Sequence, residues 1–348
     1  MKKLLTTLFL TITIFGCSCD STEPPIVEEQ PGRRDYTWTV DTLNYPYNTI
    51  YRIWGSSPDD VWATSPGGDL DKTIFHFDGV SWKTDSTVRS FSPNSVFGFA
   101  PDNVWMGGSG GKIWRYNGVE WYEFATLVKN GQKNIGINNI WGEAPNDIYA
   151  FGAYPDANSY YTNSVIAHFD NSWKMLNTDG IRGVIAHLYR DEVDGKIYLQ
   201  VPLPGEGINF DSTQIFEYSP ETSKLLYRSV WTRGKEAGIS LIDGRVHFIL
   251  GQEVALRNNN QFQTFLTIQN PNFYQRIWGR TNKDIFLLMT DGLVHYNGSN
   301  QEYLFYFNKA RTQIFGAALF EKEVFFITYE SSTNLNLIYH GVLKKGGN

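Results

Sequence analysis

The stretch WGSSPDDVW, from Trp54 to Trp62, decides the fold, because variants of it recur along the chain. The related stretches are FGFAPDNVW (Phe97 to Trp105), WGEAPNDIY (Trp141 to Tyr149) and WGRTNKDIF (Trp278 to Phe286). In each stretch an aromatic residue and Gly precede a polar turn. Asp or Asn, an aliphatic residue and a second aromatic residue follow it. The proline suits the first central position of such a turn. The recurrence indicates a structural unit that is repeated, rather than one active site.

The spacing of the repeats predicts the architecture. A fifth aromatic–Gly pair begins at Phe315, and the first three pairs lie 43 and 44 residues apart. The long interval between Trp141 and Trp278 has room for two degenerate units. We identify them in VIAHLYRDEVDGKIYL (Val184 to Leu199) and GISLIDGRVHFIL (Gly238 to Leu250). Periods of about 40 to 45 residues with several short strands are typical of a β-propeller.

Each unit also predicts a second hairpin. The segments IFHFDGVSW (74–82), IWRYNGVEW (113–121), VIAHFDNSW (165–173) and LVHYNGSNQEY (293–303) follow the repeated stretches. An alternating strand, a turn with Asp or Asn, and a strand led by an aromatic residue are typical of a β-hairpin. One unit therefore contributes four antiparallel strands, which form one blade.

The two ends of the chain are predicted to close the ring. The last unit, from Thr312 to Leu343, stops before an aromatic-led fourth strand. The N-terminal segment DYTWTVDTL (Asp35 to Leu43) places Trp38 ahead of Trp54 at the spacing expected of a fourth strand. Pairing of the two ends would remove an exposed sheet edge. We predict an all-β, seven-bladed β-propeller over residues 36–345, with six blades as the alternative.

The repeats WG-x-x-P-x-D-V-W and H-Y-D-G-x-W resemble those of secreted bacterial and lipoprotein β-propellers, and more loosely those of Asp-box and kelch propellers. The resemblance covers Asp35 to Lys345, although HFDGVSW (76–82) keeps only half of the strict Asp-box pattern. It implies the propeller fold and leaves the function open, because such propellers serve as enzymes, adhesins and scaffolds. The repeated aromatic residues are interpreted as packing residues between blades.

The N-terminus predicts export and an anchor. Leu4 to Phe15 is apolar and follows a short basic start, which is typical of a signal peptide and too short for a membrane span. It ends in TIFGC, which resembles a bacterial lipobox and implies cleavage after Gly16 and lipid attachment at Cys17. Phe15 departs from the usual lipobox, so an ordinary signal peptide or lipidation of Cys19 remain the alternatives.

Residues 17–35 are acidic and rich in proline, which predicts a flexible tether. We therefore expect a monomeric lipoprotein of the cell envelope, anchored to the outer membrane on its periplasmic or outer side. The membrane is contacted only through the lipid.

Several kinds of chemistry are not expected. The formal net charge is −6 and no basic run occurs, which argues against nucleic-acid binding. Both cysteines lie at the N-terminus, so the folded body lacks thiol chemistry. The glycine-rich GGSGGK (107–112) lacks the spacing of a phosphate loop. The histidines His76, His168 and His295 hold one repeat position in different blades. They cannot share one metal ion, so neither a metal nor a cofactor is expected.

Four polar residues are candidates for a ligand site at the mouth of the central channel. Arg52 and Arg276 precede Ile-Trp-Gly in two units, and Asn139 and Gln313 hold the same position in two others. They could bind an anion or a sugar, or only solvate the channel wall. No acid–base pair of carboxylates of the kind that glycosidases use can be placed from the sequence, so no catalytic residue is assigned.

The second candidate is a set of insertions. Connections between second and third strands leave on the same face as those between blades, and recognition is often built from such loops. The insertions are Ser65–Thr73, Tyr154–Ser164, Pro202–Thr213 and Tyr329–Asn336. The second of them includes Tyr154, Asp156, Asn158, Tyr160 and Tyr161. This composition suits a glycan or a protein surface, although it also suits an ordinary solvated loop.

The sequence thus predicts a non-catalytic binding or scaffold module for a protein or a glycan. The alternative is a carbohydrate-active enzyme with its site at the channel mouth. Two or more carboxylates converging on Arg52 and Arg276 would favour the enzyme.

Overall fold

The computed structural model describes residues 30–43, 48–67, 71–84, 86–205, 210–232 and 234–345. The predicted signal peptide, Cys17 and most of the predicted tether lie outside these residues. From Pro31 onward the chain forms one compact unit. Over the described residues, no helix has the length and apolar character needed to cross a bilayer.

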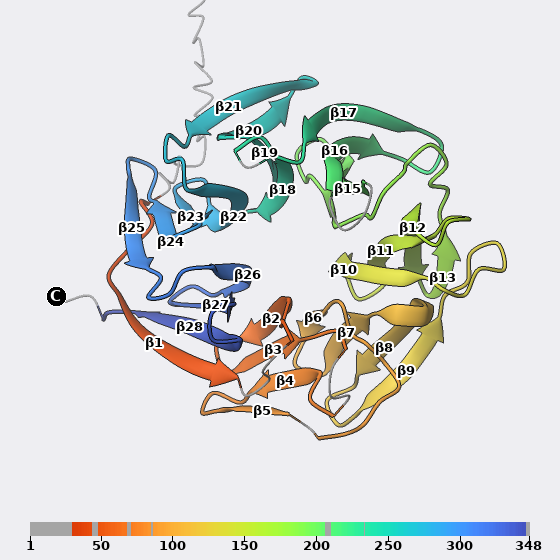
Figure 1. Ribbon diagram of the computed structural model, residues 1–348, viewed down its shortest axis with the longest axis horizontal. Helices are drawn as coiled ribbons and strands as arrows, with labels where there is room; N and C mark the ends of the chain where they lie inside the picture. The colour runs from red at the N-terminus through yellow and green to blue at the C-terminus, as the bar shows by residue number, and fades with distance from the viewer. Residues whose placement is uncertain are drawn as a thin grey trace, which may run out of the picture. The chain divides into compact units, whose positions relative to one another are not determined.

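The described residues form seven four-stranded antiparallel sheets around a central axis, which confirms the predicted seven-bladed β-propeller (Figure 1). Blade one contains β2 (Arg52–Ser57), β3 (Asp60–Thr64), β4 (Ile74–Phe77) and β5 (Trp82–Thr84). Blade two contains β6 (Phe97–Ala100), β7 (Asn103–Gly107), β8 (Lys112–Tyr116) and β9 (Trp121–Thr126), with a 3₁₀ turn, η1 (Ser109–Gly111), before β8. Blade three contains β10 (Gly136–Ala144), β11 (Asp147–Pro155), β12 (Tyr161–Asp170) and β13 (Ser172–Met175).

The two degenerate units also form complete blades. Blade four contains β14 (His187–Arg190), β15 (Ile197–Pro204), β16 (Phe210–Tyr218) and β17 (Ser223–Val230). Blade five contains β18 (Ala237–Ile242), β19 (Arg245–Leu250), β20 (Glu253–Asn258) and β21 (Gln261–Thr267). Blade six contains β22 (Phe273–Thr281), β23 (Asp284–Met289), β24 (Gly292–Tyr296) and β25 (Gln301–Tyr306).

Blade seven joins the two ends of the chain. Its strands are β26 (Thr312–Leu319), β27 (Glu323–Glu330), β28 (Leu335–Leu343) and the N-terminal β1 (Tyr36–Leu43). β1 pairs with β28 in antiparallel register from Tyr36 opposite Leu343 to Leu43 opposite Asn336. The fourth-strand position predicted for Trp38 is therefore confirmed.

The Asp-Gly or Asn-Gly pattern that several blades share in the second hairpin is explained by the structure of its turn. In blade one, the Oδ1 atom of Asp78 accepts the N–H groups of Val80 and Ser81 at 3.1 and 2.9 Å. Gly79 has φ 83°, a conformation that costs glycine little. An aspartate or asparagine followed by glycine thus directs the chain from the third strand into the fourth.

The repeated histidines are explained by contacts within single blades. His76 of β4 stacks on Trp62 of β3, with 3.9 Å between ring centroids, and its Nε2 lies 2.7 Å from the carboxylate of Asp60. The equivalent pairs are His168 with Asp147 at 2.6 Å, His295 with Asp284 at 2.6 Å and His340 with Glu323 at 2.7 Å. Each histidine therefore links the second and third strands of its own blade.

The aromatic–Gly pair packs one blade against the next. A Cβ atom added to Gly98 of β6 would lie 2.7 Å from the indole ring of Trp54 in blade one. A Cβ atom on Gly55 would likewise lie 2.8 Å from the ring of Phe320 in blade seven. The glycines allow this close approach between neighbouring sheets. The interpretation of the repeated aromatic residues as inter-blade packing is confirmed.

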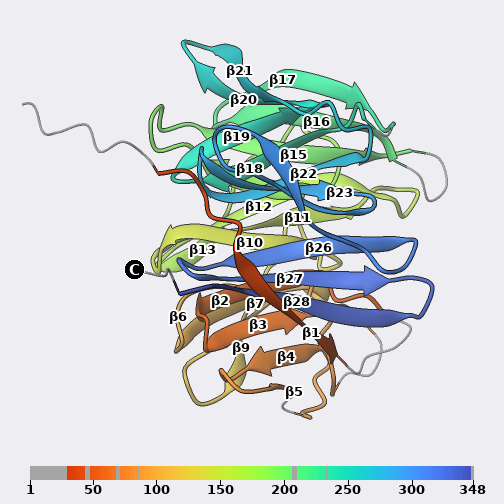
Figure 2. The same ribbon diagram turned by 90° about the vertical axis from the view of Figure 1, so that its left-hand side faces the viewer.

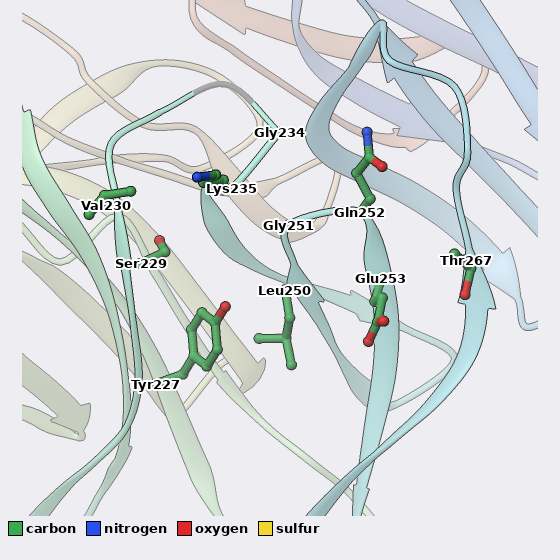
Figure 3. A pocket seen from close by; sticks show the side chains of 10 residues that line it. All are labelled: Tyr227, Ser229, Val230, Gly234, Lys235, Leu250, Gly251, Gln252, Glu253 and Thr267. Atoms are coloured by element: carbon green, nitrogen blue, oxygen red, sulfur yellow. The ribbon is translucent and has the colours of Figure 1, made fainter.

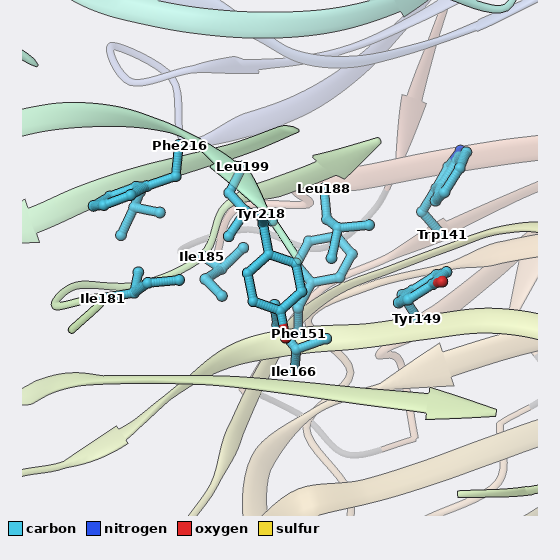
Figure 4. Close-up of a cluster of buried hydrophobic side chains, with 11 residues drawn as sticks. Trp141, Tyr149, Phe151, Ile166, Ile181, Ile185, Leu188, Leu199, Phe216 and Tyr218 are labelled. Atoms are coloured by element: carbon cyan, nitrogen blue, oxygen red, sulfur yellow. The ribbon is translucent and has the colours of Figure 1, made fainter. Parts of the chain in front are cut away.

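The hydrophobic core consists of clusters between neighbouring blades. Figure 4 shows the cluster between blades three and four, where Phe151 and Ile166 of one sheet face Leu199 and Phe216 of the other. Ile185, in the connection between the two blades, completes it and is fully buried. Each blade is therefore stabilised by its neighbours, as expected for stacked repeats.

The segment just before β1 is packed against blade six. The backbone N–H of Gly32 donates to the carbonyl of Lys283 at 2.8 Å. Arg34 donates to the carbonyls of His295 and Asn300 at 2.9 and 2.6 Å. The predicted tether of residues 17–35 thus ends in a structured part, because these residues have hydrogen-bonding partners on the propeller.

Two faces of the propeller are distinguished below. The terminal face bears residues 32–35, Lys344 and the turns between the third and fourth strands. The loop face bears the connections between second and third strands and those between blades. Figure 2 shows the start of β1, in red, on one side and the β27–β28 connection on the other. The described parts of the four predicted insertions lie on the loop face.

Candidate functional site

The innermost strands present one recurring position near the loop face. This position lies two residues before the aromatic residue of the aromatic–Gly pair, or before its equivalent in blades four and five, and the seven blades fill it differently. Its occupants, from blade one to blade seven, are Arg52, Ser95, Asn139, His187, Gly238, Arg276 and Gln313. Three of these residues interact electrostatically, namely Arg52, His187 and Arg276. They belong to blades one, four and six, which are three different blades of the ring.

The two arginines predicted for the channel mouth interact electrostatically. Burial and the nearby charge of Arg276 lower the pKa of Arg52 to about 10. The Nε atom of Arg52 is buried without a hydrogen-bond partner, and its Nη1 lies 3.4 Å from the Tyr51 carbonyl. Nη1 of Arg276 lies 3.3 Å from the Phe315 carbonyl. Neither arginine forms an ion pair with a carboxylate of the described residues.

The third side of the site is formed by His187 and Tyr189, which the sequence did not reveal. Burial lowers the pKa of His187 to about 3, with Arg52 and Arg276 acting in the same direction. Burial raises the pKa of Tyr189 to about 12. The Nδ1 atom of His187 lies 3.1 Å from the Tyr189 hydroxyl group. Both side chains are therefore neutral at pH 7.

One carboxyl group acts on the arginine pair. Burial raises the pKa of Glu236, which precedes β18, and the charge of Arg276 opposes this shift. Among the described residues, Glu236 is the one carboxyl group with a resolved effect on Arg276, and no carboxyl group has one on Arg52. A glycosidase ordinarily needs two carboxyl groups across the scissile bond. The described residues do not place such a pair beside these arginines.

A β-bulge precedes Arg276. The register between β22 and β23 shifts between Phe273 and Ile277, and Gln275 has φ 42°. Positive φ is uncommon for a residue with a side chain, and it persists where the surroundings hold it. The Gln275 side chain donates to the Phe273 carbonyl at 3.0 Å and accepts the Gly234 N–H at 3.2 Å. The bulge interrupts the strand where Arg276 enters the channel.

The other two predicted channel residues have different surroundings. The Oδ1 atom of Asn139 accepts the backbone N–H of Ile140 at 3.0 Å. Gln313 lines a cavity of about 210 Å³ between blades six and seven, together with Tyr274, Leu288, Met289, Thr290, Arg311, Thr312 and Ser331. Tyr274 also interacts electrostatically with Arg276, which follows it by two residues in β22.

The blade-three insertion is a compact turn. Asp156 accepts the N–H groups of Asn158 and Tyr160 at 2.9 and 3.1 Å, and the Thr162 hydroxyl group at 2.9 Å. Tyr160 is 50% exposed. The remaining predicted residues contact the blade itself: Tyr154 packs on the core cluster of blade three, and the Tyr161 hydroxyl donates to Asn134 at 2.9 Å. The insertion thus offers Tyr160 to solvent, while Asp156 organises the turn.

One cavity that the sequence did not predict has a volume of about 520 Å³. It opens on the loop face between blades four and five (Figure 3). Its lining residues are Tyr227, Ser229, Val230, Gly234, Lys235, Leu250, Gly251, Gln252, Glu253 and Thr267. Val230 and its neighbour Trp231 are 56% and 40% exposed. The cavity is formed by blades four and five. Their sequences have diverged from the repeated motif, so the motif could not predict it.

Together these features define a seven-bladed propeller whose loop face has a cavity between blades four and five and whose inner strands carry the interacting residues Arg52, His187 and Arg276. No family model matches the sequence, and no curated protein is significantly similar to it. Several solved propellers are similar in fold at low sequence identity. YCF48 bound to D1 peptide has 16% identity and a TM-score of 0.60 over 91% of this chain and 100% of that chain.

A virginiamycin B lyase from Staphylococcus aureus with quinupristin has 13% identity and a TM-score of 0.64 over 89% of this chain and 100% of that chain. The WD40 propeller domain of Doa1 has 11% identity and a TM-score of 0.58 over 89% and 98%. At such identities the similarity shows the fold alone, and the fold is compatible with binding as well as with catalysis.

Proposed function

We propose that this protein is a lipid-anchored, monomeric binding module of the cell envelope that engages a protein partner through its loop face. The observation that supports it best is the cavity of about 520 Å³ between blades four and five, beside the exposed Val230 and Trp231. Exposed apolar and aromatic side chains at the rim of a cavity are typical of interaction sites.

The position of the N-terminal segment supports the same proposal. Gly32 and Arg34 are bound on the terminal face, at the edge of blade six. If the chain is anchored through Cys17, the connection to the membrane leaves from the terminal face, so the loop face stays free for a partner. The cavity and the channel mouth then face the space from which a partner approaches.

A protein partner agrees better with these surfaces than the enzyme alternative does. Among the described residues, one carboxyl group, that of Glu236, acts on Arg276, whereas a glycosidase would use two. The propeller YCF48 was solved with a bound D1 peptide, so a fold of this kind is suited to holding a polypeptide. A glycan remains the alternative ligand.

Site-specific photo-crosslinking in the producing cells tests the proposal. A photoreactive residue replaces Val230 or Gln252 on the loop face. The matched controls are Val80 and Val119, which are 86% exposed in turns of the terminal face. We expect one discrete crosslinked product from the loop-face positions and none from the controls. Equal crosslinking from both faces, or crosslinking from the terminal face alone, would contradict the proposal.

A further inference from the structure

The N-terminal segment 32–34 covers one of the four repeated histidines. The side chain of His295 in blade six is 0% exposed. The equivalent side chains in three other blades are 35%, 26% and 15% exposed, and they belong to His76, His168 and His340. A Cβ atom added to Gly32 would lie 2.8 Å from the Cε1 atom of His295 and 2.5 Å from the carboxylate of Asp284. The segment therefore forms part of the cover that buries His295.

The contacts of His295 fix its protonation state. Its Nε2 atom lies 2.6 Å from Oδ1 of Asp284, whose other oxygen contacts Arg280. Its Nδ1 atom faces the Nε–H group of Arg34 at 3.2 Å. A guanidinium group donates hydrogen bonds and accepts none, so Nδ1 must be unprotonated. The ring is therefore neutral in this arrangement, and its one proton lies on Nε2 and is donated to Asp284.

Protonation of His295 would act against this contact. A second proton on the ring would occupy Nδ1 and point at the N–H group of Arg34, so the hydrogen bond would be lost and two positive groups would face each other. Burial lowers the pKa of His295, Asp284 opposes this shift, and the charges of Arg34 and Arg280 add to it. When residues 32–34 leave, the ring gains water and loses the charge of Arg34, so its pKa is higher in the released state. Release is therefore coupled to the uptake of a proton.

The other charged groups around the ring come from three strands. On β23, hydrogen bonds from His295 and Arg280 act against burial and hold the pKa of Asp284 below its ordinary value. On β22, the bond to Asp284 acts against burial and raises the pKa of Arg280. On β25, Glu302 contacts Arg34 at 2.9 Å. Asp284 and Arg280 therefore keep their charges around and below neutral pH, and the ring between Asp284 and Arg34 is the group that changes.

The remaining contacts of Arg34 lie nearer the surface. Its guanidinium group donates to the carbonyl and the side chain of Asn300 at 2.6 and 2.7 Å, and both of these bonds are exposed. The side chain of Glu302 is 57% exposed. Exposed ion pairs contribute little to stability, whereas two like charges in contact at a buried site are costly. The protonation state of His295 therefore decides whether the segment stays bound.

We propose that Gly32, Arg34 and His295 form an acid-sensitive latch, which holds residues 32–34 on blade six while the His295 ring is neutral and releases them when the ring takes up a proton. β1 stays paired with β28, so the propeller remains closed. Release uncovers the terminal face at blade six and adds residues 32–34, about 3.3 Å each when extended, to the predicted tether. The inference does not depend on a partner at the loop face, so it stands or fails separately from the proposed function.

Hydrogen–deuterium exchange of the full-length protein, followed by mass spectrometry from about pH 7.5 to about pH 5, tests the latch. The rates are corrected for the intrinsic pH dependence of amide exchange. The N–H of Gly32 donates to the Lys283 carbonyl at 2.8 Å, so it is protected while the latch is closed. We expect the protection of residues 32–34 to fall by up to about tenfold per pH unit below about pH 6.5, because release takes up one proton. The strand β1 should stay protected over the same range.

A variant at the histidine and its repeat equivalent separate the latch from other effects of acid. His295→Gln should remove the pH dependence, because an amide takes up no proton in this range. His168→Gln, at the equivalent position of blade three, is the matched control and should retain the dependence of the wild type.

A second measurement keeps the histidine in place. The NMR signals of the His295 ring are assigned through their contact with Phe286, whose ring centroid lies 4.8 Å away. In Arg34→Gln the pKa of His295 should rise above that of the wild type, because a neighbouring positive charge is removed. Arg33→Gln is the matched control: Arg33 pairs with Asp35 at 2.6 Å instead of with the ring, so the pKa should stay near that of the wild type.

Three results would overturn the inference. The first is protection of residues 32–34 that does not change with pH, or a change that persists in His295→Gln. The second is loss of protection in β1 at the same pH, which would indicate unfolding of blade seven instead of release of a latch. The third is an unchanged pKa of His295 in Arg34→Gln. The proposed function is not affected by any of them, because its crosslinking positions lie on the loop face.

Discussion

At the scale of single residues, the burial of His187 and the charges of two arginines make the stability of the protein depend on pH. Its folded pKa of about 3 lies below the ordinary value of 6.5 because of burial and the charges of Arg52 and Arg276. Between these values the unfolded chain binds a proton on this ring and the folded protein does not. The free energy of unfolding therefore falls as the pH decreases through this window, and it is retained above it.

We expect His187→Gln to flatten this dependence. The slope of the free energy of unfolding between pH 6 and pH 4 should decrease by up to about 1.4 kcal/mol per pH unit, the value for one proton. Urea unfolding at several pH values measures it. Tyr189→Phe is the control, because it removes the hydroxyl partner and keeps the imidazole, so its slope should stay near that of the wild type. Parallel slopes for His187→Gln and the wild type would show that another group governs the window.

At the scale of elements, the packing of one blade on the next depends on glycines of the inner strands. Gly98→Ala places a methyl group where a Cβ atom would lie 2.7 Å from Trp54, so the two sheets must move apart. Overpacking of this kind costs about 1–3 kcal/mol. Chemical denaturation should show this loss. Gly136→Ala is the control, since its Cβ atom would lie 3.3 Å from the Tyr161 ring edge at the surface. Equal losses in both variants would contradict the packing role.

The same elements show what the sequence could and could not predict. The spacing of the motif predicted the blades that repeat it and the closing strand with Trp38. It could do so because each of these blades uses the same turn residues and the same aromatic packing residues at equivalent positions. Blades four and five hide this signal: Ser240 stands where Trp54 does, and Lys196 and Arg245 replace the aspartate that begins the second strand. The equivalence of His187 to Arg52 was hidden for the same reason.

The remaining features of the site depend on contacts across the ring. The bulge at Gln275 is set by hydrogen bonds to other parts of the chain, and the cavity beside Val230 is formed by two different sheets. Arg52, Arg276 and Glu236 come from three separate blades, so their electrostatic interaction depends on the diameter of the channel. Local sequence patterns do not determine the diameter of the channel.

At the scale of the whole molecule, stability depends on the closing strand. Trp38 packs on Phe305 with ring centroids 4.9 Å apart, and Gly341 opposite it has no room for a Cβ atom beside the indole ring. We expect Trp38→Ala to lower the free energy of unfolding by about 3 kcal/mol, as for a large packed aromatic residue. Val40→Ala, at a 50% exposed position of the same strand, should cost less than about 0.5 kcal/mol. Equal melting temperatures for the two variants would contradict a closure that depends on Trp38.

The direction of β1 has a mechanical consequence. The strand runs from the terminal face, where Gly32 and Arg34 are held, to the loop face, and it is paired with β28 along its whole length. A pull between an anchor ahead of Gly32 and a load on the loop face is directed along this strand. The inter-strand hydrogen bonds lie perpendicular to the strands, so they are sheared together rather than opened one after another. If the chain is anchored as proposed, the seam that closes the ring is therefore oriented to withstand tension between that anchor and a partner bound on the loop face.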